Sequence, residues 1–300
     1  MEDVLNERDF TRQTISIIAF VTLSVIIYAY FIDLFSIVDA SAQTFQTTSS
    51  IVLTWRILCL FVGVSAILYM FKCGPGNMRV ISFKDCEEVI CYPTGLSKFV
   101  TFSSWTLLAN VTYFSLSTVN QALNYFGFSV PATLQNLQVV VFCCGIAMAF
   151  LTATIVRHII LPDEVKIGRN HDHMFMFHEQ IMHNFAAIFL ALELILLRPE
   201  LRVQFAVIGL FIGIVYVVFS YLFAYFGGGY IVYSFLHPKP KIAPILVFVL
   251  AGLISLFYTG LWFVSTLERV FAIPILIIWI YLIVQFRATH KEPATETTAS

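Results

Sequence analysis

Eight runs of mostly apolar residues follow one another along the chain. A helix needs about 20 such residues to cross the hydrocarbon core of a bilayer. We therefore predict an all-α fold, a polytopic transmembrane helix bundle of about eight spans. The last two runs are separated only by residues 265–269, so a kinked single helix or a re-entrant turn is the competing interpretation. The runs cover residues 14–38, 51–71, 99–123, 137–161, 178–197, 203–226, 242–264 and 270–286.

The composition supports a membrane protein. Hydrophobic residues make up 59% of the chain and charged residues 12%, whereas soluble domains carry about 25% charged residues. The net charge of −1 gives no basic field, so we expect a membrane and lipid as partners and no nucleic acid. The first run is longer than a signal-peptide core of about 7–15 residues, which favours a retained span.

The distribution of positive charge predicts the orientation. With eight spans, most of the 17 lysines and arginines fall on one side of the membrane. Only four fall on the opposite side, namely Arg56, Arg198, Arg202 and Arg269. Positively charged loops stay in the cytosol, so we predict that both termini are cytosolic.

Two side chains could form a nucleophile and base pair. Thr101 begins the third run, in KFVTFSSWTLLANVTYF, and His183 lies near the start of the fifth. The predicted topology brings both to similar depth at one membrane face. A catalytic hydroxyl and its base must approach to about 3 Å. We predict that Thr101 is the nucleophile and His183 the general base, although a transmembrane threonine commonly bonds a carbonyl of its own helix instead.

Other polar residues of these runs are candidates for lining the site. Glu193 lies ten residues after His183, about 15 Å farther along a helix, too far to bond that imidazole. It could instead be protonated, pair with Asn110 or bind a water. The substrate-contacting or site-lining candidates are Trp105, Gln180, Asn184, Glu193 and Tyr233.

Three motifs occur in order along the chain: KFVTF, then MHN with a glutamate ten residues past its histidine, then YIVYSFL. Together they resemble the androgen-induced protein family of multi-pass membrane hydrolases, which includes the androgen-dependent tissue-factor-pathway-inhibitor regulating protein. The resemblance implies a threonine-dependent hydrolase of fatty acid esters of hydroxy fatty acids, with no cofactor. It puts the motif threonine on Thr101, the histidine on His183 and the spaced glutamate on Glu193.

The resemblance also suggests how one integral membrane domain, residues 1–300, is organised. A family-like core of six spans would occupy residues 51–264, with an additional span and loop in 1–50 and another span in 265–287. The polar tail, 288–300, has the composition of a disordered segment. We expect this domain in the endoplasmic reticulum or the plasma membrane.

Two alternatives remain open. The third run is also similar to rolling-stone membrane proteins, which favours a non-enzymatic fusion or adhesion factor, or a receptor. A zinc-dependent intramembrane hydrolase would need ligands from His171, His173, His178, His183 and Glu193. The spacing argues against zinc, because no HxxxH or HxxE pair lies within a run, so we predict no metal site.

Overall fold

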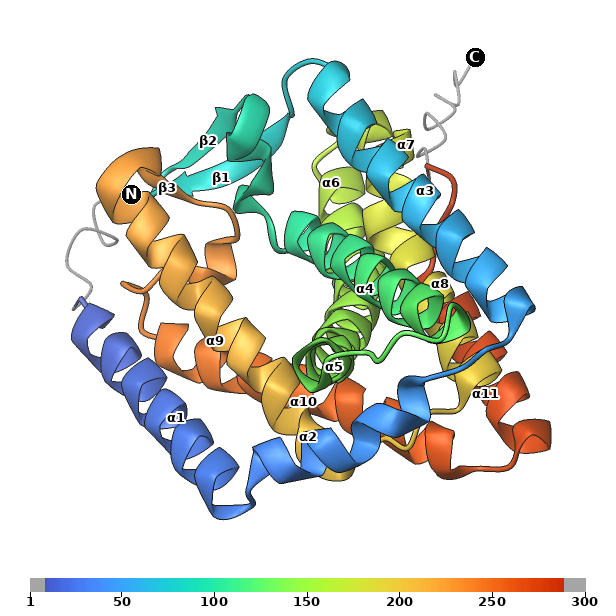
Figure 1. Ribbon diagram of the computed structural model, residues 1–300. Coiled ribbons are helices and arrows are strands. Elements are labelled where there is room, and N and C mark those ends of the chain that lie inside the picture. Colours follow the sequence, from blue (N-terminus) through green and yellow to red (C-terminus); the bar gives the residue numbers. More distant parts are fainter. Residues whose placement is uncertain (1–8, 289–300) are drawn as a thin grey trace, which may run out of the picture.

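The computed structural model describes residues 9–288, so nearly all of the predicted tail lies outside the described residues. Every apolar run contains a helix, and the helices pack together in a single bundle (Figure 1). The long helices are α1 (Thr11–Phe31), α3 (Ser50–Lys72), α4 (Phe102–Tyr125), α5 (Ala132–Ile155), α8 (Ala186–Leu197), α9 (Ala206–Phe223), α10 (Ala243–Thr266) and α11 (Arg269–Ile283). Short helices α2 (Leu34–Ala42), α6 (Leu161–Lys166) and α7 (Phe177–Gln180) complete the set.

Within residues 9–288, 6 helical segments are long and apolar enough to cross a membrane. The prediction of a helical bundle with several helices able to span a membrane is therefore confirmed. Helix α4 is long enough but too polar, because it carries Asn110, Ser117, Asn120 and Gln121, all of which are buried. Helix α11 is apolar but has only 15 residues. The six segments are Thr11–Phe31, Ser50–Lys72, Ala132–Lys166, Phe177–Leu197, Val203–Gly228 and Ala243–Thr266.

One predicted run differs from the structure, and one open alternative is decided by it. The run 14–38 is not one helix, because Asp33 takes a left-handed conformation with φ of 48° and separates α1 from α2. Aspartate tolerates that conformation better than most residues. The last two runs form separate helices that pack on each other, joined by the extended residues Leu267 and Glu268. The kinked-helix interpretation is therefore wrong.

A small antiparallel sheet lies at one end of the bundle, where the sequence predicted only loops (Figure 1). Its strands are β1 (Met78–Ser82), β2 (Glu88–Cys91) and β3 (Tyr230–Ile231), in the order β2-β1-β3. Strand β1 pairs Ile81 with Ile231. The sheet thus ties the segment that leads into α4 to the segment that follows α9.

Helices α4 and α5 form the centre of the bundle. Helices α3 and α8 contact α4, while α9 and α10 pack on the other side of α5. Helix α1 lies outermost, against α9 and α10 (Figure 1). A Cβ at Gly145 of α5 would lie 3.4 Å from the side chain of Leu190 and 3.8 Å from that of Ala109. A small residue there lets the three central helices approach closely.

Candidate active site

Thr101 is the N-cap of α4 and lies one residue before the helix begins. Its Oγ1 accepts a hydrogen bond from the backbone N–H of Ser104 at 3.1 Å and lies 2.7 Å from Ser104 Oγ. The Ser104 hydroxyl donates to the carbonyl of Lys98 at 2.7 Å. Because that bond uses the serine hydrogen, the Thr101 hydroxyl must donate to Ser104.

The helix that carries His183 is interrupted by a π-helical turn, Ile181–Phe185, between α7 and α8. Such turns occur frequently at functional sites. His183 Nε2 lies 3.4 Å from Oε2 of Glu179, and His178 Nε2 lies 3.3 Å from Oε1 of the same carboxylate. Both imidazoles therefore lie beside the same carboxylate. His183 Nδ1 is buried without a hydrogen-bond partner among the described residues.

Thr101 and His183 line the same cavity, which has a volume of about 650 Å³. Glu179, His173 and Tyr233 line it as well. Burial lowers the pKa of His173, which favours its neutral form at pH 7. Of the predicted site residues, the structure therefore brings together Thr101, His183 and Tyr233.

The wall of this cavity formed by β1 and α6 is charged. Arg79 pairs with Asp163 and has its Nε 3.5 Å from Oε1 of Glu164. Arg169 Nη1 lies 3.2 Å from Oε2 of the same glutamate. Sequence analysis missed these residues and Glu179. The signal for Glu179 was its spacing four residues before His183, which puts both on one helical face.

No hydrogen bond joins Thr101 to His183 in the part of the chain that the structure describes. The hydroxyl is bonded to Ser104, and the imidazole contacts Glu179. The two side chains share a cavity, but a rotation of the threonine hydroxyl is needed before its proton could pass to the imidazole.

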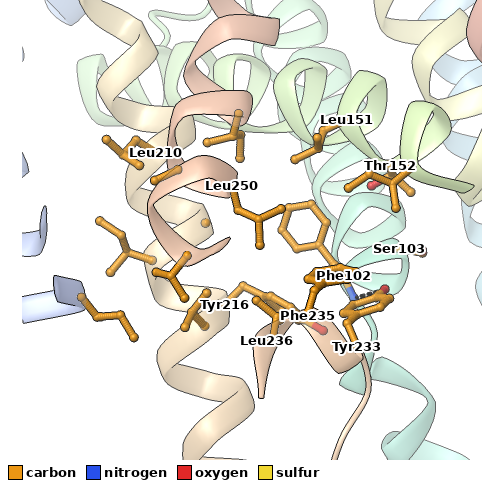
Figure 2. A pocket seen from close by; sticks show the side chains of 18 of the residues that line it. Phe102, Ser103, Leu151, Thr152, Leu210, Tyr216, Tyr233, Phe235, Leu236 and Leu250 are labelled. Carbon is orange, nitrogen blue, oxygen red and sulfur yellow. Dashed lines mark hydrogen bonds between the residues drawn. The ribbon is translucent and has the colours of Figure 1, made fainter. Parts of the chain in front are cut away.

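An apolar slot adjoins the charged cavity, and Figure 2 shows side chains that line this slot. Ser103, Tyr233 and Phe235 line both spaces. Figure 2 shows Tyr233 beside Phe102, where its hydroxyl accepts a hydrogen bond from the Phe102 N–H at 3.2 Å. Burial raises the pKa of Tyr233, so it keeps its hydrogen at neutral pH. The start of α4 therefore lies at the junction of a charged space and an apolar one.

Four predicted site residues do not line the cavity, namely Trp105, Gln180, Asn184 and Glu193. Trp105 Nε1 donates to the carbonyl of Phe99 at 3.0 Å. The Asn184 amide donates to Gln180 Oε1 at 2.7 Å and to the carbonyl of Gln285 at 2.7 Å, and accepts from the Gln285 N–H at 3.0 Å. Asn184 thus anchors the chain that follows α11, and the side-chain donors of Trp105 and Asn184 are already hydrogen-bonded.

Glu193 lies in a separate buried cluster. Its Oε1 accepts from Arg56 Nε at 2.8 Å and from the Tyr113 hydroxyl at 2.8 Å. Arg56 and Glu193 are 1% and 0% exposed. The amide of Asn110, the partner suggested by the sequence, instead lies 3.5 Å from the carbonyl of Ala186. Arg56 therefore lies inside the bundle and not in a loop. It should not be counted among the loop charges that predict the orientation.

No group of three His, Cys, Asp or Glu side chains within residues 9–288 could hold a metal ion. The zinc interpretation has no ligand set there, since Glu193 is paired with Arg56. Comparison with known proteins adds no further constraint: no family model, curated protein or solved structure matches the chain.

The cap of α4 leads to a stability prediction. Thr101→Ala removes the side-chain bond to the Ser104 N–H and is expected to lower the free energy of unfolding by about 1 kcal/mol. Thr101→Asn, which retains a capping oxygen, should stay within about 0.5 kcal/mol of the wild type. Thermal unfolding of the purified variants in detergent measures both. Equal stability of the alanine and asparagine variants would contradict the cap.

Proposed function

We propose that the chain is a membrane hydrolase of lipid esters, with fatty acid esters of hydroxy fatty acids as its substrate class. The observation that supports this proposal is that Thr101 and His183 line one charged cavity that shares a wall with an apolar slot. A lipid ester needs both environments, one for its reacting carbonyl and one for its chain. We place the cavity at the cytosolic face of the endoplasmic reticulum or plasma membrane, with both termini cytosolic.

In this mechanism Thr101 Oγ1 attacks the ester carbonyl while His183 takes the hydroxyl proton. The imidazolium then protonates the departing alkoxide, which leaves as a hydroxy fatty acid. Water hydrolyses the acyl-threonine in a second step, with His183 again as base. Glu179 contacts the imidazole in the structure and would stabilise its charged form. The threonine hydroxyl must first turn away from Ser104, a type of adjustment that substrate-free active sites commonly need.

The N-terminus of α4 offers a donor to the developing oxyanion. The Phe102 N–H follows Thr101 directly and now donates to the Tyr233 hydroxyl. In the proposed reaction the substrate oxygen takes that bond in place of Tyr233. The positive end of a long helix favours negative charge at this point.

The test is lipid ester hydrolysis by the purified protein in lipid nanodiscs. We expect release of free fatty acid and, after rapid acid quenching, an acyl group on the peptide that contains Thr101. Thr112→Ala is the matched control, because Thr112 lies on the same helix, is exposed and does not line the cavity. Absence of turnover by folded protein would contradict the proposal.

One observation favours a second candidate, a non-enzymatic lipid receptor. The Thr101 hydroxyl is already bonded twice to Ser104 as a helix cap, a role that needs no chemistry. A receptor would use the same cavity and slot to bind the ester without cleaving it. Recovery of intact, stoichiometrically bound ester from the protein would support this candidate over the hydrolase.

A further inference from the structure

The geometry points to the apolar slot as the binding site for a single acyl chain, with α1 as its outer wall. This inference rests on the proposed function for what happens at the polar end of the ligand. The binding of the chain itself is a separate claim, which can be measured without hydrolysis.

Five helices line the slot: α1, α5, α9, α10 and, through Phe102 and Ser103, the start of α4. Leu151 comes from α5, Leu210 from α9 and Leu250 from α10, and Figure 2 shows their side chains around one space. Ile18 and Val21 of α1 close the outer side. Helix α1 otherwise faces outward, with Phe20 67% and Leu23 57% exposed. Without α1, this side of the slot would open directly to the surrounding lipid.

The polar side chains at the slot have their hydrogen bonds elsewhere. The Thr152 hydroxyl is bonded to Thr106 Oγ1 at 3.0 Å, and Tyr216 donates to the carbonyl of Val100 at 3.0 Å. Tyr233 accepts from the Phe102 N–H. Because Thr152 and Tyr216 are hydrogen-bonded within the protein and most other lining side chains are apolar, the slot favours an apolar ligand.

The residues that line both spaces indicate what kind of ligand fits. The slot meets the charged cavity at Ser103, Tyr233 and Phe235, so a molecule that fills both must be apolar at one end and polar at the other. A linear acyl chain with an ester or carboxylate head has this form. Its head would lie beside Thr101 and its tail between α1, α5, α9 and α10.

Gly213 of α9 leaves room for the chain. A Cβ there would lie 3.6 Å from Ile254 Cδ1, an ordinary van der Waals contact, so a Cβ can be added without a clash. Since Gly213 lines the slot, leucine at this position would occupy space that the acyl chain needs. Gly252 of α10 is the matched control, because it is exposed, does not line the slot and has no atom within 4 Å of its built Cβ.

The experiment uses a palmitate analogue with a diazirine at its methyl end, photocrosslinked to the protein in nanodiscs and mapped by peptide mass spectrometry. We expect labels on the five helices that line the slot, and a loss of labelling of about tenfold in Gly213→Leu, equivalent to about 1.4 kcal/mol of binding free energy. Gly252→Leu should label like the wild type. Unchanged labelling of Gly213→Leu, or labels outside these helices, would overturn the inference.

A second pair of variants covers the case in which Gly213→Leu does not fold. Val21→Trp narrows the slot from α1, whereas Leu23→Trp changes an exposed position on the same helix. Only Val21→Trp should lose labelling. Thr101→Asn should retain the labelling even though it lacks turnover. A loss of labelling would therefore contradict the acyl site, whereas a lack of turnover in the wild type would contradict only the hydrolase proposal. Competition by a sterol but not by palmitate would also overturn the inference.

Discussion

Replacing Thr101 by asparagine is expected to abolish ester hydrolysis, with a loss in kcat/KM of about 10³–10⁶-fold, the range seen when a catalytic nucleophile is removed. The physical reason is that the amide can still cap α4 but cannot form an acyl-enzyme. Steady-state hydrolysis measures the loss, and thermal unfolding shows whether the fold persists. A folded variant without turnover separates the chemical role of this residue from its structural role.

His183→Ala should cause a loss of similar size, because the proton of the attacking hydroxyl would have no acceptor. Residues that act as a unit are not additive, so the double variant Thr101→Asn/His183→Ala should be no slower than either single variant. Thr101→Ser keeps both hydroxyl and cap and should retain measurable turnover. Full activity in either single variant would refute the mechanism.

Removal of Arg56 is expected to cause the largest loss of stability. Arg56→Met leaves the carboxylate of Glu193 without its cation at a site that is 0% exposed. Breaking one side of a buried ion pair costs about 3–5 kcal/mol. The arginine also donates to Gln121 Oε1 at 3.0 Å and to the carbonyl of Ser117 at 3.3 Å, so α3, α4 and α8 lose a common link. Thermal unfolding in detergent measures the effect.

The double variant Arg56→Met/Glu193→Leu should regain most of that stability, since two apolar side chains leave no isolated charge. Arg12→Met is the matched control, because Arg12 is exposed at the start of α1. If the double variant were as unstable as Arg56→Met, an unpaired charge would not be the cause.

Hydrophobic length predicted the helices because it depends on the local sequence and on the bilayer thickness alone. The same reasoning anticipated that Thr101 and His183 lie at one end of the bundle, and they share a cavity. The partners of these residues depend on side-chain geometry that no spacing rule supplies. Two features could not be predicted for this reason. One is the hydrogen bond between Ser104 and the Thr101 hydroxyl, and the other is the π-helical turn around His183.

The errors have specific physical causes. Arg56 was counted with the loops because a lone arginine near the edge of an apolar run resembles a boundary, and its carboxylate partner is 137 residues away. Strand β3 was missed because it has only two residues and exists only through its pairing with β1. Both features depend on contacts between segments far apart in the sequence, where local patterns carry little information.

The hydrogen bonds between Asn184 and the backbone of Gln285 have a mechanical consequence. They connect the residue next to His183 to the chain that leaves α11. Helix α11, with 15 residues, would extend about 22 Å, less than the hydrocarbon thickness of about 30 Å. A short apolar helix responds to bilayer thickness by shifting or tilting. Through this connection, thicker or thinner membranes would pull on the turn that carries the imidazole.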